Sequence, residues 1–303
     1  MNGIEKGISR EQIHIPVMVK EVIELLDIVP DGVYIDATVG LGGHSKAILS
    51  YLGSKGRLIG IDRDEEAIKY SEKRLNNERV FLKKGSFSQI EEILLSMGVK
   101  QIDGVLFDLG VSMLQLKDMD RGFSFMSEKR LDMRMDLSQE LTAWDVINNY
   151  PENELERVIR EYGEEPFARK IARAIVKERS ISPINTCIDL STLIARIYRK
   201  RGKTHPATRV FQALRIEVNK ELSELKKGLM SAVRMLRVGG RIAVISYHSL
   251  EDRIVKNFMK ENAREGYIRI ITKKPIVPTK EEIMLNPSSR SAKLRGGEKI
   301  CQR

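Results

Sequence analysis

Cysteine is scarce in this sequence, and its scarcity excludes several classes of protein. Only two of the 303 residues are cysteines, Cys187 and Cys301, which are too few for a disulfide framework. Neither has a second cysteine or a histidine pair nearby at the spacing of a zinc site. We therefore expect neither a disulfide-stapled secreted domain nor a bound metal.

Long apolar runs are also missing. No stretch approaches the roughly 18 residues that a membrane-spanning helix needs. The segment MNGIEKGISREQIHIP (1–16) lacks the basic-then-apolar layout of a secretory signal. A hydrophobic content of 42% with 31% charged residues is typical of a globular chain that buries a core. We therefore expect a cytoplasmic protein.

Acidic residues are scarce in two segments of a chain whose net charge is +10. None lies between Asp189 and Glu217, where seven basic residues occur, and residues 268–303 hold nine Lys and Arg against three Glu. Clustered positive charge suits a polyanion such as nucleic acid, because neutralised phosphates release condensed counterions. The alternative is the solvated surface of a lysine-rich protein, and composition alone does not decide between them.

Short apolar runs alternate with helical patterns over the first third of the chain. This order implies parallel strands with right-handed crossovers, and hence a doubly wound, Rossmann-like α/β sheet. Strands are expected at 33–36, 57–62, 80–83, 103–109 and 241–246, and helices at 17–26, 44–52, 64–75, 88–97 and 222–236.

The alternation stops at about residue 112. Residues 113–217 show little strand-like patterning, and Pro151 and Pro166 suit the first positions of helices. We expect an α-helical domain of residues 113–217, inserted between the fourth and fifth strands. It divides the α/β domain into residues 1–112 and 218–303.

Two features of the second α/β part are also predicted. Gly239-Gly240 is expected as a turn that precedes the fifth strand. The basic, polar segment 286–303 is expected as a tail that becomes ordered only on a partner.

A glycine-rich stretch, DATVGLGGHS (36–45), follows the first expected strand. Gly40, Gly42 and Gly43 allow a nucleotide to approach the backbone closely, but Ser45 stands where a dinucleotide fingerprint requires glycine. The lysine of a P-loop is missing as well. Asp62 ends the second strand, where a carboxylate accepts hydrogen bonds from both hydroxyls of a ribose.

Three acids lie at the ends of the first, second and fourth strands of the expected sheet. Asp36, Asp62 and Asp108 lie at carboxyl ends, which line the ligand crevice in this architecture. Carboxylates there repel a diphosphate and favour a ligand with a sulfonium, an ammonium and a ribose. That ligand is S-adenosylmethionine (SAM), which we favour over NAD. The alternative is that Asp36 and Asp108 merely cap turns.

Asp108 also suits chemistry on an exocyclic amine. Such an amine is a poor nucleophile, because its lone pair is conjugated with the ring. Acceptors that grip the amino protons, such as Asp108 and the Leu109 carbonyl, free that lone pair, although Asp108 also suits the amino group of SAM. Candidates for stacking on the target base are Phe123, Phe125 and Tyr247, although a place in the core is the commoner role for each.

Ten motifs occur in order from His14 to Arg295. They are HIPVM (14–18), DATVGLGGHS (36–45), GIDRD (60–64), DLGVS (108–112), RGFSF (121–125), LDMRMD (131–136), YGEE (162–165), HPATRVFQALRIEVN (205–219), SYHSLEDRIVK (246–256) and NPSSRSAKLR (286–295). Together they closely resemble the MraW/RsmH family of SAM-dependent methyltransferases. The resemblance implies methylation of the N4 amino nitrogen of a cytidine in the decoding region of 16S rRNA, in the small ribosomal subunit.

The resemblance also implies a set of cofactor contacts. Carried over position by position, they fall on Gly42, Gly43, His44, Asp62, Phe87, Asp108 and Gln115. Phe87 and Gln115 rest on the resemblance alone. The chain departs from the usual family pattern at Met113-Leu114, where Ser-Pro is common, at Tyr247 in place of Phe, and at Ser288 in place of Arg.

RNA phosphates are expected to dock on the basic stretch and the tail, at Arg199, Lys200, Arg201, Arg209, Arg215, Arg290, Lys293 and Arg295. His248 either takes the proton lost on methylation or is a hydrogen-bonded structural histidine. Two other functions remain open: a DNA or small-molecule amino-methyltransferase, and a non-catalytic RNA-binding assembly factor that retains the SAM fold.

Overall fold

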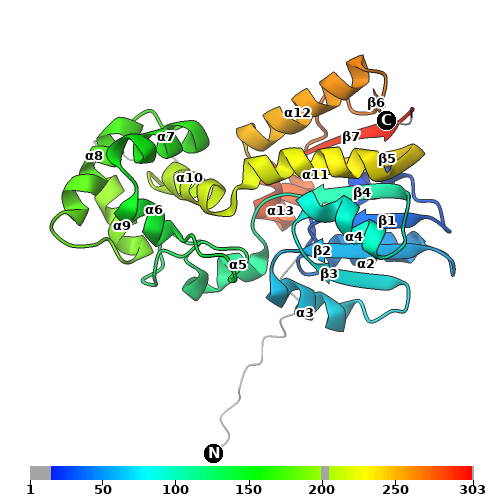
Figure 1. Ribbon diagram of the computed structural model, residues 1–303, viewed down its shortest axis with the longest axis horizontal. Coiled ribbons are helices and arrows are strands. Elements are labelled where there is room, and N and C mark those ends of the chain that lie inside the picture. The colour runs from blue at the N-terminus through cyan, green and yellow to red at the C-terminus, as the bar shows by residue number, and fades with distance from the viewer. Residues whose placement is uncertain (1–14, 199–204, 302–303) are drawn as a thin grey trace, which may run out of the picture.

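A seven-stranded sheet forms the larger of two lobes in the computed structural model, which describes residues 15–198 and 205–301. Figure 1 shows the second lobe beside it, built of helices that include α6 to α10. No helix in the described ranges is both long and apolar enough to cross a membrane.

The sheet has the order β3-β2-β1-β4-β5-β7-β6. β1 to β5 pair in parallel, whereas β7 runs antiparallel to both of its neighbours. This order confirms the predicted doubly wound α/β fold, with the change of winding direction between β1 and β4. The strands are β1 (Val33–Asp36), β2 (Arg57–Asp62), β3 (Val80–Lys84), β4 (Ile102–Asp108), β5 (Leu236–Ser246), β6 (Ile268–Ile270) and β7 (Lys293–Lys299).

Helices cover both faces of the sheet, because successive strand side chains point to opposite sides. Ile35 and Ile59 pack with α4, α11 and α12 on one face, and Tyr34 and Leu58 pack with α1 and α2 on the other. The helices are α1 (Val19–Leu26), α2 (Gly43–Tyr51), α3 (Glu65–Arg74), α4 (Ile90–Ser96), α11 (Glu221–Met235), α12 (Ser249–Arg264) and α13 (Lys280–Leu285).

The second lobe has a hydrophobic core of its own. The buried residues of that core all come from the segment between Phe123 and Val218. The chain enters this segment after β4 and returns to the sheet through α11 and β5, as expected for an insertion between the fourth and fifth strands. Its helices are α5 (Met113–Lys117), α6 (Ala143–Asn149), α7 (Glu152–Gly163), α8 (Ala168–Arg179), α9 (Cys187–Ala195) and α10 (Thr208–Asn219).

The prediction of a tail that orders only on a partner is wrong. Pro287–Ser291 form a 3₁₀ helix, η4, and β7 lies inside the sheet between β5 and β6. Leu294 of β7 is fully buried, and Arg295 pairs with Asp252 of α12 (Nε to Oδ1, 2.7 Å). Pairing with β5 and this ion pair fix a segment whose local composition is polar.

Two smaller expectations are also corrected. Gly239-Gly240 lies within β5 rather than in a turn before it, opposite the irregular pairing between Ile102 and Gly104. Pro151 is the N-cap of α7 rather than its first residue, and Pro166 precedes Phe167, the N-cap of α8.

Candidate cofactor site

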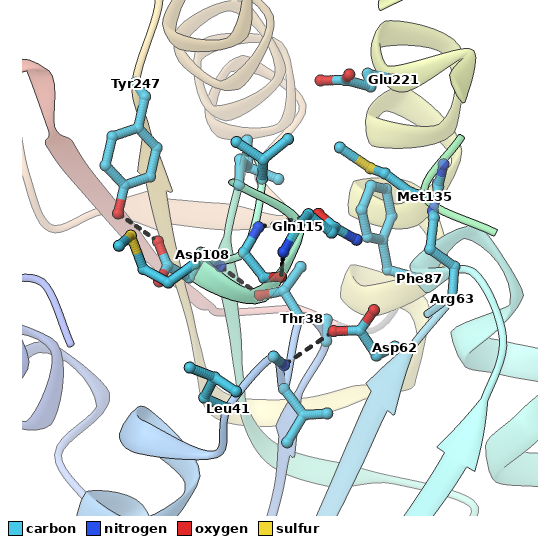
Figure 2. Close-up of a pocket in the computed structure, with 18 of the residues that line it drawn as sticks. Thr38, Leu41, Asp62, Arg63, Phe87, Asp108, Gln115, Met135, Glu221 and Tyr247 are labelled. Carbon is cyan, nitrogen blue, oxygen red and sulfur yellow. Dashed lines mark hydrogen bonds between the residues drawn. The ribbon is translucent and has the colours of Figure 1, made fainter. Parts of the chain in front are cut away.

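A cavity of about 270 Å³ opens at the carboxyl edge of the sheet. Its lining includes the segments that follow β1, β2, β3 and β4, and the beginning of α11 (Figure 2). Ligands of doubly wound sheets bind at this edge, beside the change of winding direction. Polar, charged and aromatic residues of the lining include Thr38, His44, Asp62, Arg63, Phe87, Asp108, Gln115, Arg215, Glu221, Tyr247 and Glu251.

The glycine loop turns the chain from β1 into α2. Gly40 and Gly42 have φ angles of +50° and +72°, in the left-handed region that favours glycine. A Cβ on Gly43 would lie 3.0 Å from the ring carbons of Pro16. Gly40, Gly43 and His44 line the cavity, whereas Gly42 is the N-cap of α2 and shapes the turn.

The His44 ring lies beside the carboxylate of Asp108. Nε2 of His44 is 2.8 Å from the Val17 carbonyl oxygen, which can only accept, so Nε2 carries a hydrogen. Nδ1 lies 3.5 Å from Asp108 Oδ2. In the neutral ring this Nδ1 is itself an acceptor, so the contact is favourable only when the pair holds one further proton.

Asp108 is held from three sides at the end of β4. Its Oδ1 accepts a hydrogen bond from the Tyr247 hydroxyl at 2.8 Å, and its backbone N–H donates to Thr38 Oγ1 at 2.7 Å (Figure 2). Burial raises the pKa of the Asp108 carboxyl, while the His44 ring and the Tyr247 hydroxyl oppose that rise. A carboxyl fixed in this way is suited to accept hydrogen bonds from an amino group.

Asp62 faces the cavity from the end of β2. Its Oδ2 accepts from the Gly40 N–H and its Oδ1 from the Asp64 N–H, both at 2.9 Å. Burial raises the pKa of Asp62 to about 6, although these two backbone donors favour the charged form. Each oxygen keeps a lone pair for a further donor, such as a ribose hydroxyl.

Asp36 does not take the place expected for it. Its Oδ2 accepts from the Ser45 hydroxyl at 2.7 Å, and the side chain is buried behind the loop, outside the cavity lining. Two acids that the strand-end pattern did not select, Glu221 and Glu251, line the cavity with Asp62 and Asp108. The cavity therefore has the acidic character that disfavours a diphosphate, but the acids that supply it are not the three predicted ones.

Phe87 lies in η2 (Phe87–Gln89), between α11 and the cavity. Its ring meets that of Phe107 edge to face at 5.6 Å, and the Arg63 guanidinium carbon is 5.6 Å from its centroid. Figure 2 shows Met135 on the opposite side of Phe87 from β2. Aromatic, thioether and guanidinium groups gathered here suit a flat, apolar ring system such as adenine.

Gln115 lines the cavity, but its amide group is already engaged. Its Oε1 accepts from the Ser112 N–H at 3.0 Å, and its Nε2 donates to Asp64 Oδ2 at 2.9 Å. The same Asp64 oxygen accepts from Arg121 at 3.0 Å, and Arg121 also donates to the Met135 carbonyl at 2.9 Å. Gln115 thus belongs to a network that holds the inserted segment against the end of β2.

The two additional acids each have close polar partners. Glu221 forms a two-point ion pair with Arg215, with Nε to Oε1 and Nη2 to Oε2 both at 2.8 Å. Glu251 accepts from the Tyr247 N–H at 2.8 Å and lies 3.2 Å from His248 Nε2, although poorly aligned for a hydrogen bond. These contacts fix the two side chains in the cavity lining.

Glu221, His248 and Glu251 form the one cluster, within residues 15–198 and 205–301, whose ligand atoms could surround a metal ion. Arg215 already engages both oxygens of Glu221. His248 Nδ1 accepts from the Glu251 N–H at 3.4 Å, so its Nε2 carries the hydrogen in the neutral ring and cannot ligate. His248 is the N-cap of α12, a structural position outside the cavity lining.

The predicted RNA-binding residues fall into different environments. Arg209 and Arg290 are exposed, Arg215 lines the cavity, and Arg199, Lys200 and Arg201 lie outside the described residues. Lys293 and Arg295 both pair with Asp252, and Arg295 is only 8% exposed. The last placement argues against a direct phosphate contact at Arg295.

The three candidate aromatic residues are separated by the fold. Tyr247 lines the cavity, whereas Phe123 is buried in the core of the helical lobe and Phe125 stacks on His205 at 4.4 Å. Sequence reasoning missed Arg63, Met135, Glu221 and Glu251 as cavity residues. The motifs GIDRD, LDMRMD and SYHSLEDRIVK contain three of the four, so the ordered motifs were the available signal.

The MraW methylase family matches residues 11–300 of this chain. The chain belongs to this family. A relative from Caldicellulosiruptor bescii, named ribosomal RNA small subunit methyltransferase H, is 52% identical over 304 residues, which cover 95% of this chain and 99% of the relative. A relative of the same name from Fusobacterium nucleatum is 49% identical, with coverage of 95% and 97%.

A solved rRNA methylase from Streptococcus thermophilus is 13% identical and covers 93% of this chain and 94% of its own, with a TM-score of 0.42. That likeness is too low to carry a functional argument. The resemblance to the MraW methylase family, expected from ten ordered motifs, is confirmed by the match over nearly the whole chain.

The residues that depart from the usual MraW methylase motifs lie in or beside the cavity. Met113-Leu114 lies in α5, which a reciprocal pair of hydrogen bonds between Ser112 and Gln115 caps. Tyr247 supplies the hydroxyl that bonds Asp108, a group that a phenylalanine lacks. Ser288 lines the cavity, where an arginine would add a positive charge.

Proposed function

We propose that this protein transfers a methyl group from SAM to the exocyclic N4 of a cytidine in 16S rRNA, in the decoding region of the small ribosomal subunit. One observation carries the proposal: relatives about half identical over 95% of the chain are named ribosomal RNA small subunit methyltransferase H. The chemistry of the cavity supports the same reaction.

The lining suits SAM in its charge and in the chemistry of its side chains. Four carboxyl groups suit a ligand with an ammonium and a sulfonium, and they oppose a diphosphate. Asp62 accepts from the ribose hydroxyls, Phe87 and Met135 contact the adenine, and Gly43 allows the ligand to approach the backbone. When bound, SAM supplies an activated methyl group.

Asp108 is the residue proposed to act on the acceptor amine. A carboxylate that accepts a hydrogen bond from the amino group opposes conjugation of the nitrogen lone pair with the ring. Tyr247 and His44 hold Asp108 in place for this role. Asp108 also suits the ammonium group of SAM, and one carboxylate has lone pairs for both partners.

The target cytidine must leave its stack to reach a cavity at the edge of the sheet. We expect the helical lobe and its basic stretch to hold the surrounding RNA, with the chain working in the cytoplasm. Arg199, Lys200, Arg201 and Arg209 are the proposed phosphate contacts of this stretch, and Arg290 is a further one.

The test is methylation of small ribosomal subunits that lack the modification. Incubated with labelled SAM, the protein is expected to place one methyl group on a cytidine of 16S rRNA. Digestion to nucleosides and mass spectrometry identify the product as N4-methylated. Label on a different atom, or none on RNA, would contradict the proposal.

Two controls separate the remaining candidates. A DNA or small-molecule methyltransferase labels DNA or small amines and leaves the subunits unlabelled. A non-catalytic assembly factor binds RNA but transfers no label. Calorimetric titration with S-adenosylhomocysteine, in wild type and Asp62→Ala, checks the cofactor site independently of the RNA, because only a functional pocket loses affinity in the variant.

A further inference from the structure

Arg215 extends into the cavity from the helical lobe. Its helix, α10, buries Val210, Phe211 and Leu214 in the lobe core, and Arg215 follows on another face with only 16% of its side chain exposed. From the predicted insertion, the described residues that line the cavity are otherwise uncharged: Met113, Gln115, Leu116 and Met135.

Glu221 fixes the orientation of the Arg215 guanidinium. Lys220, in the left-handed region at φ 52°, turns α10 into α11 and brings Glu221 back toward Arg215. The two-point ion pair uses Nε and Nη2, both at 2.8 Å. Within the described part of the chain, Nη1 has no acceptor, so the Nη1 edge remains available to a ligand in the cavity.

The available edge needs acceptor atoms that lie in one plane. A phosphate would add negative charge to a cavity whose four carboxyl groups outnumber its two arginines, Arg63 and Arg215. A neutral ring carbonyl with an adjacent ring nitrogen satisfies the donors without that charge. Cytosine presents this pattern at O2 and N3, next to its N4 amino group.

We propose that Arg215 recognises the target base, with its Nη1 edge donating hydrogen bonds to O2 and N3 of the cytosine. This inference rests on the proposed function and names the residue that selects the base. Asp108 takes the donor end of the same base edge, and Arg215 takes the acceptor end. Uracil presents a carbonyl in place of the amine, and adenine has no O2. Either base therefore forms fewer hydrogen bonds with Asp108 and Arg215 than cytosine does.

The test combines a variant with a base analogue. The double variant Arg215→Gln/Glu221→Gln removes both charges of the ion pair while keeping two polar side chains in place. The RNA carries either cytidine or 2-thiocytidine at the target position, introduced by ligation, because sulfur is a weaker acceptor than oxygen. Single-turnover methylation, S-adenosylhomocysteine affinity and melting temperature are measured for each protein.

The variant is expected to methylate cytidine about 10- to 100-fold more slowly, the range for losing hydrogen bonds from a charged donor. In wild type, 2-thiocytidine lowers the rate, whereas in the variant it causes no further loss, since the hydrogen bond to that atom is already missing. S-adenosylhomocysteine affinity stays within about twofold. The control Arg234→Gln/Glu91→Gln makes the same charge change at an exposed ion pair between α11 and α4, and it leaves all three measurements unchanged.

Other outcomes overturn the inference. If 2-thiocytidine lowers the methylation rate by the same factor in wild type and in the variant, Arg215 does not contact O2. A loss of S-adenosylhomocysteine affinity assigns Arg215 to the carboxylate of the cofactor, and uniformly weaker RNA binding with a smaller salt dependence assigns it to a phosphate. If the double variant melts early, Arg215→Lys replaces it, because lysine keeps the charge but not the planar edge. Failure of wild type to methylate cytidine contradicts the proposed function itself.

Discussion

Residues with the same placement in the sequence have different roles, because distant partners orient them. Asp36 and Asp62 both end a strand of the sheet, and the sequence pattern does not distinguish them. The Ser45 hydroxyl draws Asp36 behind the loop, whereas backbone donors hold Asp62 at the cavity. The strand-end pattern could not select Glu251, since its cavity position depends on how α12 packs on β5, β6 and β7. Strand-end acids were predictable, but their orientation was not.

The carboxyl of Asp62 leads to a prediction about pH. Its pKa is raised to about 6 by burial. In the proposed cofactor complex, ribose hydroxyls would donate to its charged form. Below about pH 6 the protonated form prevails, so cofactor affinity falls by up to about 10-fold for each pH unit. Titration with S-adenosylhomocysteine between pH 5 and 8 measures this dependence.

The variant Asp62→Asn provides the comparison. Its affinity at pH 8 is expected to be at least about 10-fold below that of wild type, because a charged acceptor is removed. Its dependence on pH near 6 is expected to flatten. A variant that keeps the full dependence would assign the titration to another group, such as Asp108, whose pKa burial also raises.

At the scale of elements, strands formed by apolar runs were easier to predict than a strand formed by polar residues. β1 and β2 were predicted with their observed bounds, because continuous apolar runs end there in an acid. β7 was missed, since KLRGGEK holds two glycines and four charges. It is a strand because β5 and β6 pair with it on both sides and Asp252 neutralises Arg295. These contacts are long-range, so no local pattern contains them.

The packing of α11 on η2 allows a prediction about an element. A Cβ on Gly228 would lie 2.7 Å from the Phe87 ring and 3.3 Å from that of Phe107. In a helix with free space around the position, Gly→Ala stabilises the folded state by about 0.5–1 kcal/mol. Overpacking of this contact destabilises it by about 1–3 kcal/mol. Gly228→Ala is therefore expected to lower the melting temperature and to weaken S-adenosylhomocysteine binding several-fold, because Phe87 must shift.

Calorimetry and thermal melting check both effects. Lys226→Ala on the exposed side of the same helix is the matched control and should leave cofactor affinity unchanged. A more stable Gly228→Ala with wild-type affinity would show that α11 does not press on Phe87.

At the scale of the molecule, the two lobes meet where α10 turns into α11. Asn219 accepts from the Met135 N–H and donates to the Met133 carbonyl, both at 2.8 Å, while its own carbonyl accepts from Arg63 at 2.9 Å. One residue thus joins the inserted segment, the end of β2 and the helix junction. The division of the chain into residues 1–112, 113–217 and 218–303 remains a prediction, and the separate core of the helical lobe supports it.

That division of labour predicts that RNA affinity and cofactor affinity change independently. Reversing two charges of the basic stretch, Arg199→Glu with Arg201→Glu, is expected to weaken binding to small-subunit RNA. The slope of log affinity against log salt should fall by about 0.7–0.9 for each phosphate that the variant no longer neutralises. S-adenosylhomocysteine affinity should stay unchanged, because the cavity residues are not altered.

The matched control is Lys55→Glu with Lys100→Glu, which changes the net charge equally. Both lysines are exposed and precede β2 and β4, so they lie at the amino edge of the sheet, opposite the cavity. Filter binding at several salt concentrations and calorimetry compare the two pairs. If the lysine variant and the arginine variant weaken RNA binding equally, the effect comes from net charge alone. A loss of cofactor affinity in the Arg199→Glu/Arg201→Glu variant would contradict the proposal that one lobe binds RNA and the other binds SAM. A charge reversal on a surface that contacts only RNA leaves the pocket at the carboxyl edge intact.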